Sequence, residues 1–199
     1  MNKQHTSTIK QFFDKAAASW DTYNGGETDK LVSLLKAAHF PSHAKVLDVA
    51  CGTGVMVEPV LTFQPIKLLA MDISPAMIEI LESKYSALSC LQAAVQDFYL
   101  YDPDEQADVL IVYNAYPHFI DKQRFSAQII KCLRPGGRFI IAHGSGRQVI
   151  NSRHDSLDKP CISTPLLSCS EEASRLGSEF VYDVMLETED YYILSGTTK

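Results

Sequence analysis

The chain has 199 residues, of which 46% are hydrophobic and 21% charged, a balance typical of one globular domain. Its formal net charge of −6 argues against a nucleic-acid partner, because phosphates are usually met by clustered Lys and Arg. No apolar run approaches the roughly 20 residues that cross a bilayer, and the N-terminus lacks the apolar core of a signal peptide. The five cysteines are scattered without a Cys-x-x-Cys pair, so we expect reduced thiols in the cytoplasm.

Two helices are expected ahead of the first strand. Residues 8–20 place Ile9, Phe12 and Phe13 at helical spacing, and residues 29–40 repeat an apolar pattern of the same period. The helices frame a short polar stretch with two glycines, which permits a hinge between them.

A strand, a tight turn and a helix are predicted from residue 45 onward. An apolar run that contains Asp48 stops at Gly52 and Gly54, after which residues 55–61 resume with helix-like spacing. A turn without Cβ atoms at two positions lets a ligand lie against bare backbone, and the next helix offers unpaired N–H groups. Taken alone, the Gly-x-Gly pair also fits a generic turn, so its meaning depends on the neighbouring strands.

A second apolar strand at residues 67–73 carries Asp72 at its end. The acid comes after Gly54 at close to the spacing of about 20 residues at which doubly wound folds place the carboxylate that binds ribose hydroxyls. An NAD-dependent oxidoreductase would also have a strand, a glycine turn, a helix and a later acid. Its Gly-x-Gly-x-x-Gly fingerprint is absent here, because Val57 occupies the place of the third glycine.

The remaining pattern alternates strands and helices and ends in a hairpin. Further strands are expected near 89–95, 107–113 and 137–143, helices near 54–63, 75–85 and 121–133, and two adjacent strands at 179–187 and 191–196. Such alternation implies helices on both faces of a parallel sheet. We predict an α/β, Rossmann-like, seven-stranded and mostly parallel sheet that a C-terminal antiparallel hairpin closes.

These motifs together resemble the class I S-adenosylmethionine-dependent methyltransferases. Residues 46–54 look like their first motif, 71–77 like the second strand with its ribose-binding acid, and 96–98 like the adenine segment. Residues 107–114 are similar to the family's fourth strand, and 133–141 to its Leu-x-Pro-Gly-Gly turn before strand five. The likeness runs from about residue 10 to the C-terminus. Two departures are Ala50, where many members have glycine, and Gln96 ahead of Asp97, where many have Gly-Asp.

The resemblance implies S-adenosylmethionine as cofactor. Asp48, Gly52 and Gly54 would hold its methionine end, Asp72 the ribose, and Asp97 with Phe98 the adenine. The whole cofactor set that the likeness gives is Asp48, Ala50, Cys51, Gly52, Gly54, Asp72, Ile73, Met77, Asp97, Phe98 and Asn114.

The first 40 residues are expected to belong to the same domain as the core at 41–199. Residues 12–23 resemble the entry segment of small-molecule methyltransferases related to those that act on quinone precursors, where the segment forms a lid over the cofactor. That likeness places Trp20 and Tyr23 above the pocket as substrate-binding residues. A lid that excludes water favours a small-molecule substrate.

Candidate catalytic residues come directly after the strands, since ligands of open α/β sheets bind beyond the carboxyl ends. A general base at neutral pH is most simply a histidine, which makes His118, His143 and His154 the candidates, with His118 the first choice. Tyr116 comes after the fourth strand, and Arg147 and Asn151 would share a helix face with His154 toward the pocket mouth. Packing or solvated roles remain the alternative for each of these residues.

Other functions also fit the pattern. Three converging histidines would suit a metal ion, although nothing in the sequence shows that they converge, and we assign none. The order Asn114-Ala115-Tyr116-Pro117 differs from the Asn/Asp-Pro-Pro-Tyr motif of methyltransferases that act on amide or base nitrogens. A sensor or partner subunit that binds the cofactor without catalysis stays open. The expected assembly is a monomer or a homodimer.

Overall fold

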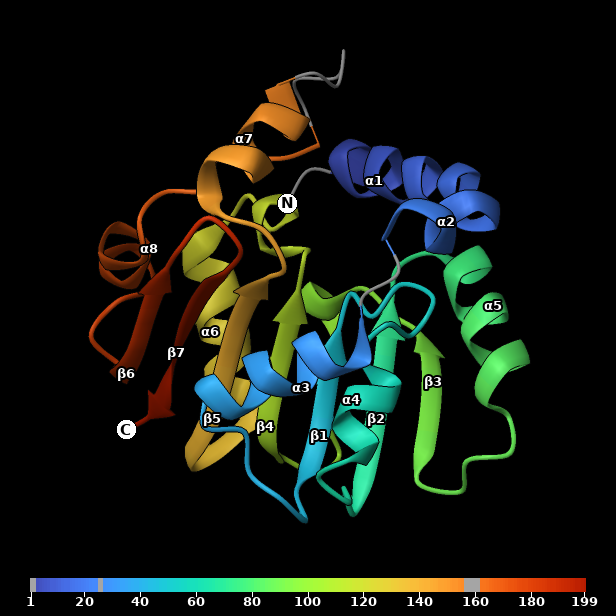
Figure 1. Cartoon of the computed structure of the whole chain (residues 1–199), viewed down its shortest axis with the longest axis horizontal. Helices are drawn as coiled ribbons and strands as arrows, with labels where there is room; N and C mark the ends of the chain where they lie inside the picture. The colour runs from blue at the N-terminus through green and yellow to red at the C-terminus, as the bar shows by residue number, and fades with distance from the viewer. Residues whose placement is uncertain (1–2, 25–26, 156–161) are drawn as a thin grey trace.

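The computed structural model describes residues 3–24, 27–155 and 162–199. Within these ranges seven strands form one sheet in the order β3-β2-β1-β4-β5-β7-β6 (Figure 1). Strands β1 to β5 run parallel, and β7 pairs antiparallel with both β5 and β6. The bounds are β1 Lys45–Val49, β2 Lys67–Asp72, β3 Leu91–Val95, β4 Ala107–Tyr113, β5 Leu133–His143, β6 Phe180–Glu187 and β7 Tyr192–Thr198.

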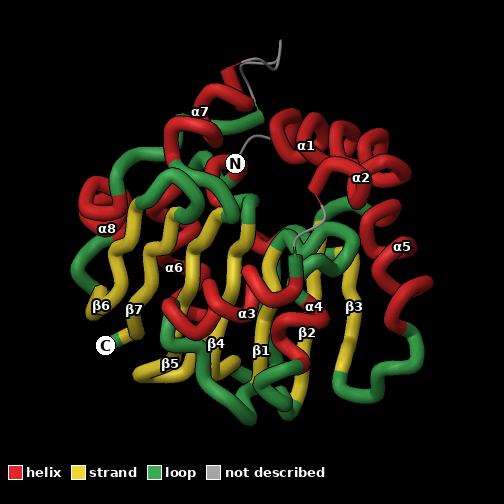
Figure 2. The backbone as a smooth tube through the Cα atoms, in the orientation of Figure 1, coloured by secondary structure: helices red, strands yellow, loops and turns green. Residues whose placement is uncertain are grey.

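Helices cover both faces of this sheet (Figure 2). Helices α3 Thr28–Ala37, α4 Val57–Leu61 and α5 Pro75–Tyr85 pack on one face, and α6 Lys122–Cys132 and α8 Cys169–Leu176 pack on the other. The remaining helical elements are α1 Lys3–Ala16, η1 Ala17–Ser19, α2 Trp20–Asn24, η2 Phe98–Leu100, η3 Tyr116–His118 and α7 Arg147–Asp155. The predicted fold class is confirmed.

Strand β4 shows why the sheet has two apolar faces. Leu110 and Val112 belong to the core under α6 and α8, whereas Val109 and Ile111 belong to the core under α3 and α4. All four side chains are fully buried. Alternate residues of a strand point to opposite faces, so a strand covered on both sides reads as a continuous apolar run.

Several boundaries differ from the sequence expectation. The single helix predicted over residues 8–20 is divided, because η1 interrupts it after Ala16 and α2 begins at Trp20. Strand β5 begins at Leu133, which is earlier than expected. Its pairing with β4 shifts between Ala107 and Val109, so the Pro-Gly-Gly sequence forms an irregularity inside the strand instead of a turn before it.

Helix α8 was absent from the sequence expectation although its start carries a readable signal. The Ser168 hydroxyl accepts a hydrogen bond from the backbone N–H of Glu171, and the Glu171 carboxylate accepts one from the N–H of Ser168. This capping box satisfies two backbone donors at the helix start. The Ser-x-x-Glu spacing would have placed the helix.

The carboxyl ends of β1, β2 and β4 meet below α1 and α2 (Figure 1). Strand order reverses between β1 and β4. On one side of β1 lie β2 and β3, and on its other side lie β4 and β5. Open α/β sheets bind their ligands at such a switch point. The fold therefore directs attention to the space between this sheet edge and the N-terminal helices.

Gly144 comes after β5 and lies against the ring of Tyr113 at the end of β4. A Cβ atom at Gly144 would lie 2.2 Å from the Tyr113 hydroxyl oxygen and 3.3 Å from its Cζ atom. Real Cβ atoms do not approach that closely. The absence of a side chain at Gly144 is what lets these two strand ends meet.

We predict that Gly144→Ala lowers the free energy of unfolding by about 1–3 kcal/mol through overpacking. The same change made in a Tyr113→Phe background costs less, because the nearest colliding atom is then gone. Urea unfolding of the two single variants and the double variant measures this difference. An equal cost of Gly144→Ala in both backgrounds would show that the Tyr113 hydroxyl is not the obstacle.

Candidate functional site

A chamber lies between the N-terminal helices and the carboxyl edge of the sheet. Most of its walls come from the loops after β1, β2, β3 and β4, and the roof comes from α1 and α2. The lining residues are Thr6, Ile9, Phe13 and Trp20 from the roof, and Val49, Ala50, Cys51, Gly52, Val55, Met71, Asp72, Ile73, Met77, Gln96, Asp97, Phe98, Tyr99, Tyr113, Asn114, Ala115, His118 and Phe119 from the sheet side.

Asp72 holds the glycine loop against the end of β2. One of its carboxylate oxygens accepts a hydrogen bond from the backbone N–H of Gly52 at 2.9 Å, and the other accepts one from Ser74 at 2.9 Å. The loop reverses direction through positive φ angles of 56° at Ala50 and 55° at Gly52. Only glycine adopts this region without cost, so Ala50 holds a strained conformation that the Asp72 bond to Gly52 helps to stabilise.

Asp48 is a buried carboxyl one residue before the chamber wall. Its side chain is fully buried, and neither carboxyl oxygen has a hydrogen-bond partner among the described residues. Burial raises the pKa of Asp48 to about 7, and the nearby Asp72 charge adds to the effect. A buried carboxyl without a partner is costly to ionise, which is why its pKa is raised.

The pKa of Asp72 is also raised above its ordinary value. Burial is the largest cause and raises it, while the hydrogen bonds from Ser74 and Gly52 partly offset this effect. A carboxylate has about four acceptor sites, so two backbone bonds leave capacity for further donors. Asp72 therefore both fixes the loop and offers acceptors to the chamber.

The loop after β3 contributes a third carboxylate and an aromatic wall. One oxygen of Asp97 accepts a hydrogen bond from the N–H of Tyr99 at 2.9 Å and so caps η2. Phe98 is buried, and its ring packs against Phe119 with centroids 5.9 Å apart. Met77 of α5 completes this part of the wall. An apolar slot beside a carboxylate suits a planar heterocycle with polar edges.

The roof lies directly on the glycine loop. The Nε1 atom of Trp20 is 3.4 Å from where a Cβ of Gly52 would stand, so the indole covers bare backbone. The ring of Phe13 packs edge-to-face against Trp20, with centroids 5.5 Å apart. The side chain of Tyr23, predicted to share this position, lies outside the described part of the chain.

Two carboxylates latch the roof to the loops after β1 and β2. Asp14 of α1 accepts a 2.6 Å hydrogen bond from the Ser74 hydroxyl, and Asp21 of α2 accepts hydrogen bonds from Thr53 and Lys84. Burial raises the pKa of Asp21, but the bonds from Lys84 and Thr53 outweigh it and hold the pKa below its ordinary value. The latch residues Ser74 and Thr53 each neighbour a chamber residue in sequence.

The three candidate histidines occupy different surroundings. His118 lines the chamber, its Nδ1 atom lies 2.8 Å from the carbonyl oxygen of Ile162, and its ring packs edge-to-face against Phe13. His143 is buried beside Tyr192 and does not belong to the chamber lining. The side chain of His154 lies outside the described residues. The structure therefore brings His118 alone, of the two described candidates, to the chamber.

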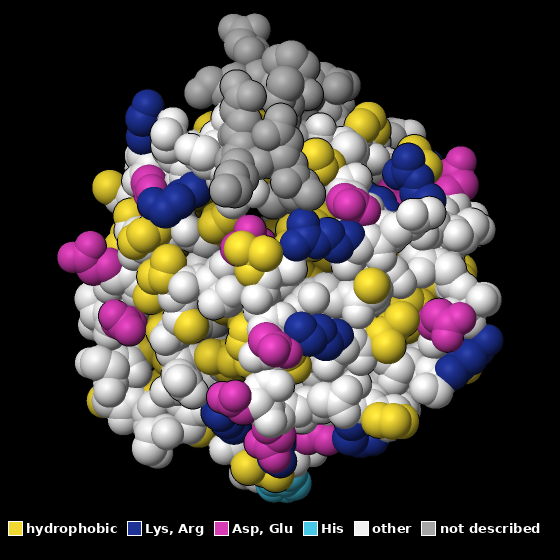
Figure 3. Space-filling view, turned by 180° about the vertical axis from the view of Figure 1, so that it is seen from behind, with side chains coloured by type: hydrophobic (Ala, Val, Ile, Leu, Met, Phe, Trp, Pro, Cys, Tyr) yellow, Lys and Arg dark blue, Asp and Glu magenta, His cyan; other side chains and the backbone are white. Residues whose placement is uncertain are grey.

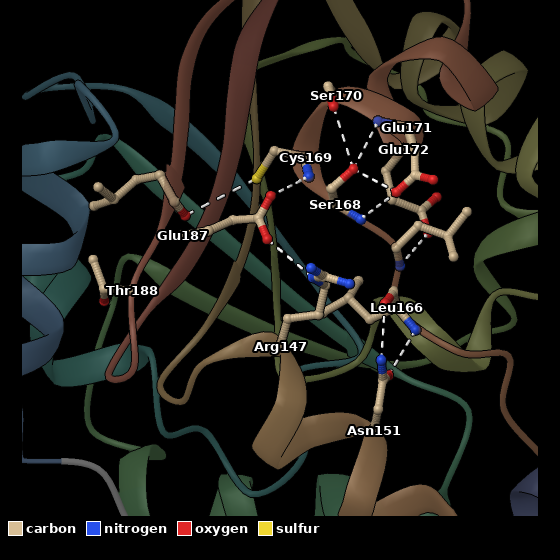
Figure 4. Close-up of polar contacts among 12 residues, drawn as sticks. Arg147, Asn151, Leu166, Ser168, Cys169, Ser170, Glu171, Glu172, Glu187 and Thr188 are labelled. Carbon is tan, nitrogen blue, oxygen red and sulfur yellow. Dashed lines mark hydrogen bonds and ion pairs between the residues drawn. The ribbon is translucent and has the colours of Figure 1, made fainter.

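Three residues predicted to bind substrate lie elsewhere. Tyr116 is fully buried, and its hydroxyl donates a 2.7 Å hydrogen bond to Glu172 in the core. The Arg147 guanidinium pairs with Glu187 at 3.0 Å, and the Asn151 amide bonds the backbone of Leu166 (Figure 4). Their placement differs from the prediction because each side chain finds a protein partner outside the chamber.

Several lining residues were missing from the sequence-based set. Thr6, Ile9 and Phe13 line the chamber from one face of α1, at spacings of three and four residues that a helix brings together. Phe119 is next to His118 in the chain and was overlooked because no motif marks it. The helical spacing could have identified the first three, whereas Phe119 needed the course of the loop.

The described residues show neither a metal site nor a membrane-spanning helix. No group of three His, Cys, Asp or Glu side chains among them is arranged to hold a metal ion. No helix in the described ranges is both long and apolar enough to cross a membrane.

Comparison with known proteins decides the family. Residues 47–141 match the methyltransferase domain family, and the fold matches N-methyltransferase NodS from Bradyrhizobium japonicum in complex with S-adenosylhomocysteine, with a TM-score of 0.74 at 14% identity over 96% of this chain and 98% of that one. Residues 47–141 therefore carry a methyltransferase domain. The DhpI complex with S-adenosylhomocysteine gives the same TM-score at 16% identity, covering 100% of this chain and 98% of DhpI.

Two curated relatives of this chain differ in the substrate that their names give. Malonyl-[acyl-carrier protein] O-methyltransferase 1 of Ilyobacter polytropus is 27% identical over 138 residues, which cover 67% of this chain and 51% of the relative. Demethylmenaquinone methyltransferase of Symbiobacterium thermophilum is 30% identical over 149 residues, 69% of this chain and 59% of the relative. The chain thus spans about half to three fifths of the length of these relatives.

The raised pKa of Asp48 makes the free energy of unfolding fall as the pH rises. Its pKa is raised from 3.8 to about 7 in the folded protein, so the folded chain holds a proton there that the unfolded chain releases. The stabilising contribution is present below about pH 4 and is lost as the pH rises through about 7. We predict that Asp48→Asn becomes more stable relative to the natural protein between pH 5 and pH 8, by on the order of 2 kcal/mol. Urea unfolding at both pH values measures it.

The exposed Asp102 supplies the control for this measurement. Asp102→Asn should leave the stability difference between the two pH values nearly unchanged, because its carboxylate is 85% exposed. A gap between Asp48→Asn and the natural protein that is the same at pH 5 and pH 8 would contradict the assignment.

The latch at Asp21 can be monitored through Trp20, the sole tryptophan of the chain. We predict that Asp21→Asn loosens the roof, because the bonds to Thr53 and Lys84 lose their charge, and that acrylamide then quenches Trp20 fluorescence more strongly. Asp190→Asn, in the β6–β7 turn, is the matched control. Equal quenching in the two variants would mean that Asp21 does not hold the roof closed.

Proposed function

We propose that this chain transfers a methyl group from S-adenosylmethionine to a small-molecule acceptor. The observation that carries the proposal is one chamber that joins two carboxylates, Asp72 and Asp97, to His118 beneath a latched roof. The cofactor side and the acceptor side meet in this space. The activities for which the two relatives are named, and the S-adenosylhomocysteine in two structural neighbours, support the same activity.

The residues present fit S-adenosylmethionine. Asp48 has two buried oxygens that lack a partner among the described residues, and the cationic methionine end would supply one. Asp72 offers acceptors for ribose hydroxyls next to backbone that carries no Cβ at Gly52. Asp97 and Phe98 combine a carboxylate with an aromatic wall for the adenine. Ala50, Cys51, Ile73, Met77 and Asn114 line the same space, while Gly54 shapes the loop at a φ of 92°.

The bound cofactor would supply an activated methyl group for an in-line displacement. The protein then has to position the acceptor and exclude water, which is worth up to about 7–11 kcal/mol in favourable cases. Trp20 and Phe13 close the roof over the reacting end. His118 lies beside them, with its ring packed against Phe13, and would accept the acceptor's proton, a role worth roughly 10²–10⁴-fold in rate. His143 is buried away from the chamber lining, and the side chain of His154 lies outside the described residues, so the role is proposed for His118.

The acceptor side is apolar and carries no formal positive charge. Ile9, Phe13, Phe119 and Ala115 form much of it, and none of the described lining residues is Lys or Arg. A carboxylate or phosphate acceptor would enter without a counter-ion, at a high desolvation cost. The acceptor is therefore an uncharged small molecule with an ionisable O–H, N–H or S–H group.

Surface charge and free thiols give the broader setting. On the face in Figure 3, basic side chains are interspersed with acidic ones, which together with the net charge of −6 disfavours nucleic acid. Cys51, Cys90, Cys132 and Cys169 are free thiols, as in the cytoplasm. We infer that residues 1–40, which hold the lid and the first helix, belong to one domain with the core at 41–199, and that the protein acts as a monomer or a homodimer.

A protein that binds the cofactor without catalysis is the main alternative. The same cofactor residues would serve a sensor, so only turnover separates the two. His118 is the residue on which they differ, because a sensor has no use for a proton acceptor beside the reacting end.

We predict that Asp72→Asn weakens S-adenosylmethionine binding about 10–100-fold, since charge-assisted bonds to the ribose are lost. His118→Gln should leave that affinity within about twofold and lower transfer of labelled methyl to uncharged phenol, thiol and amine acceptors about 100-fold or more. Calorimetry and product counting are the measurements. His39→Gln, an exposed position outside the chamber, is the matched control.

Three results would contradict the proposal. Binding of NAD and not of S-adenosylmethionine would show that the proposed cofactor is wrong. Equal loss of cofactor affinity in Asp72→Asn and His118→Gln would remove the division of roles. Unchanged transfer by His118→Gln would remove the base.

A further inference from the structure

Residues 162–168, here called the strap, cross the loop that carries His118. The carbonyl oxygen of Ile162 lies 2.8 Å from His118 Nδ1. The backbone N–H and the hydroxyl of Thr164 both donate to the carbonyl oxygen of Pro117, at 2.9 and 3.3 Å. The strap therefore contacts two successive residues of η3 through polar atoms.

The Ile162 contact decides which ring nitrogen of His118 carries the proton. A backbone carbonyl has no proton to give, so Nδ1 must be the donor. The neutral ring then has its acceptor lone pair on Nε2. The other tautomer would bring two acceptor atoms within 2.8 Å of each other. A proton acceptor at Nε2 is what the proposed reaction requires of His118.

Asn151 of α7 fixes the strap. Its amide nitrogen donates to the carbonyl oxygen of Leu166 at 3.0 Å, and its amide oxygen accepts from the Leu166 N–H at 2.8 Å. Figure 4 shows this pair of bonds, which satisfies both backbone groups of one residue with one side chain. Leu166 and Ile162 are each 1% exposed, so the strap is packed into the interior at both of these positions.

Glu172 of α8 meets the strap and η3 together. Its carboxylate accepts a hydrogen bond from the Leu167 N–H at 3.1 Å and another from the Tyr116 hydroxyl at 2.7 Å. The Glu172 side chain is completely buried. The strap and the residue two before His118 are thus held by the same carboxylate, which limits their movement relative to each other.

We propose that Asn151 is a positioning residue that acts through the strap on His118. By pinning Leu166 it keeps the Ile162 carbonyl on Nδ1 and so holds the ring in the Nδ1–H tautomer, with Nε2 as the acceptor. This inference rests on the proposed function in that His118 is the base. It gives Asn151 a role at a distance, in contrast to the direct substrate contact that the sequence suggested.

The test reads the tautomer by NMR. Long-range proton–nitrogen spectra of protein labelled with ¹⁵N in histidine distinguish a protonated from an unprotonated ring nitrogen, and the signals that vanish in His118→Gln identify His118. We expect the natural protein, with S-adenosylhomocysteine present, to show Nδ1 protonated and Nε2 unprotonated. Asn151→Ala should shift the signals toward the Nε2–H form, which isolated histidine side chains favour.

The matched control is Ser152→Ala. Ser152 is the next residue of α7, and its hydroxyl bonds the Gln148 carbonyl within the helix, so it does not touch the strap. The conservative Asn151→Asp retains the bond from the Leu166 N–H and should give a smaller shift. Asn151→Asp also takes the place of Asn151→Ala in this test if Asn151→Ala fails to fold.

The outcomes separate the inference from the proposed function. An Nε2–H tautomer in the natural protein, or signals that are the same in both Asn151 variants and in Ser152→Ala, would overturn the role of Asn151 whatever the activity. Undiminished methyl transfer by His118→Gln would instead overturn the assignment of the base, while the tautomer result would stand.

Discussion

The Asp72 carboxylate is the contact on which the site depends. It joins the end of β2 to the glycine loop after β1 through Gly52, and it anchors the start of α5 through Ser74. Both partners are backbone N–H groups, so the contact fixes the course of the chain and not only the place of a side chain. Without it, the left-handed turn at Ala50 would have to be held by the remaining loop contacts alone.

The roof attaches to the same two loops. Asp14 reaches the Ser74 hydroxyl and Asp21 reaches Thr53, so the N-terminal helices are tied to backbone that Asp72 has already fixed. Closure of the chamber is thereby coupled to the order of the cofactor loops. A ligand that engages Asp72 and the glycine loop would act on the roof through these contacts, which is a physical route from cofactor binding to exclusion of water.

The sequence predicts the position of many chamber residues, and the predictions that are wrong share a cause. Gly52, Asp72 and Asp97 lie at strand ends with characteristic spacings, so local pattern places them correctly at the chamber. Tyr116 also lies just after a strand, yet η3 turns its side chain into the core, where Glu172 lies 56 positions further along the chain. The partners of Arg147 and Asn151 come from β6 and from the strap, neither of which helix periodicity can reveal. Direction of a side chain depends on such distant partners.

The charge of the chamber is concentrated on the proposed cofactor side. The carboxylates of Asp72 and Asp97 lie at the ends of β2 and β3, while the roof and the loop after β4 supply apolar rings and a single histidine. This division suits a cationic cofactor opposite an uncharged acceptor. The acceptor's identity then depends on the shape that Phe13 and Phe119 leave between them.

A crystal structure of the chain with S-adenosylhomocysteine tests the central claim most directly. We expect the ribose hydroxyls on Asp72, the adenine beside Phe98, and the sulfur facing His118 under a closed roof. A ligand bound outside the chamber, or one seated with its sulfur turned away from His118, would contradict the assignment of this chamber as the site of methyl transfer.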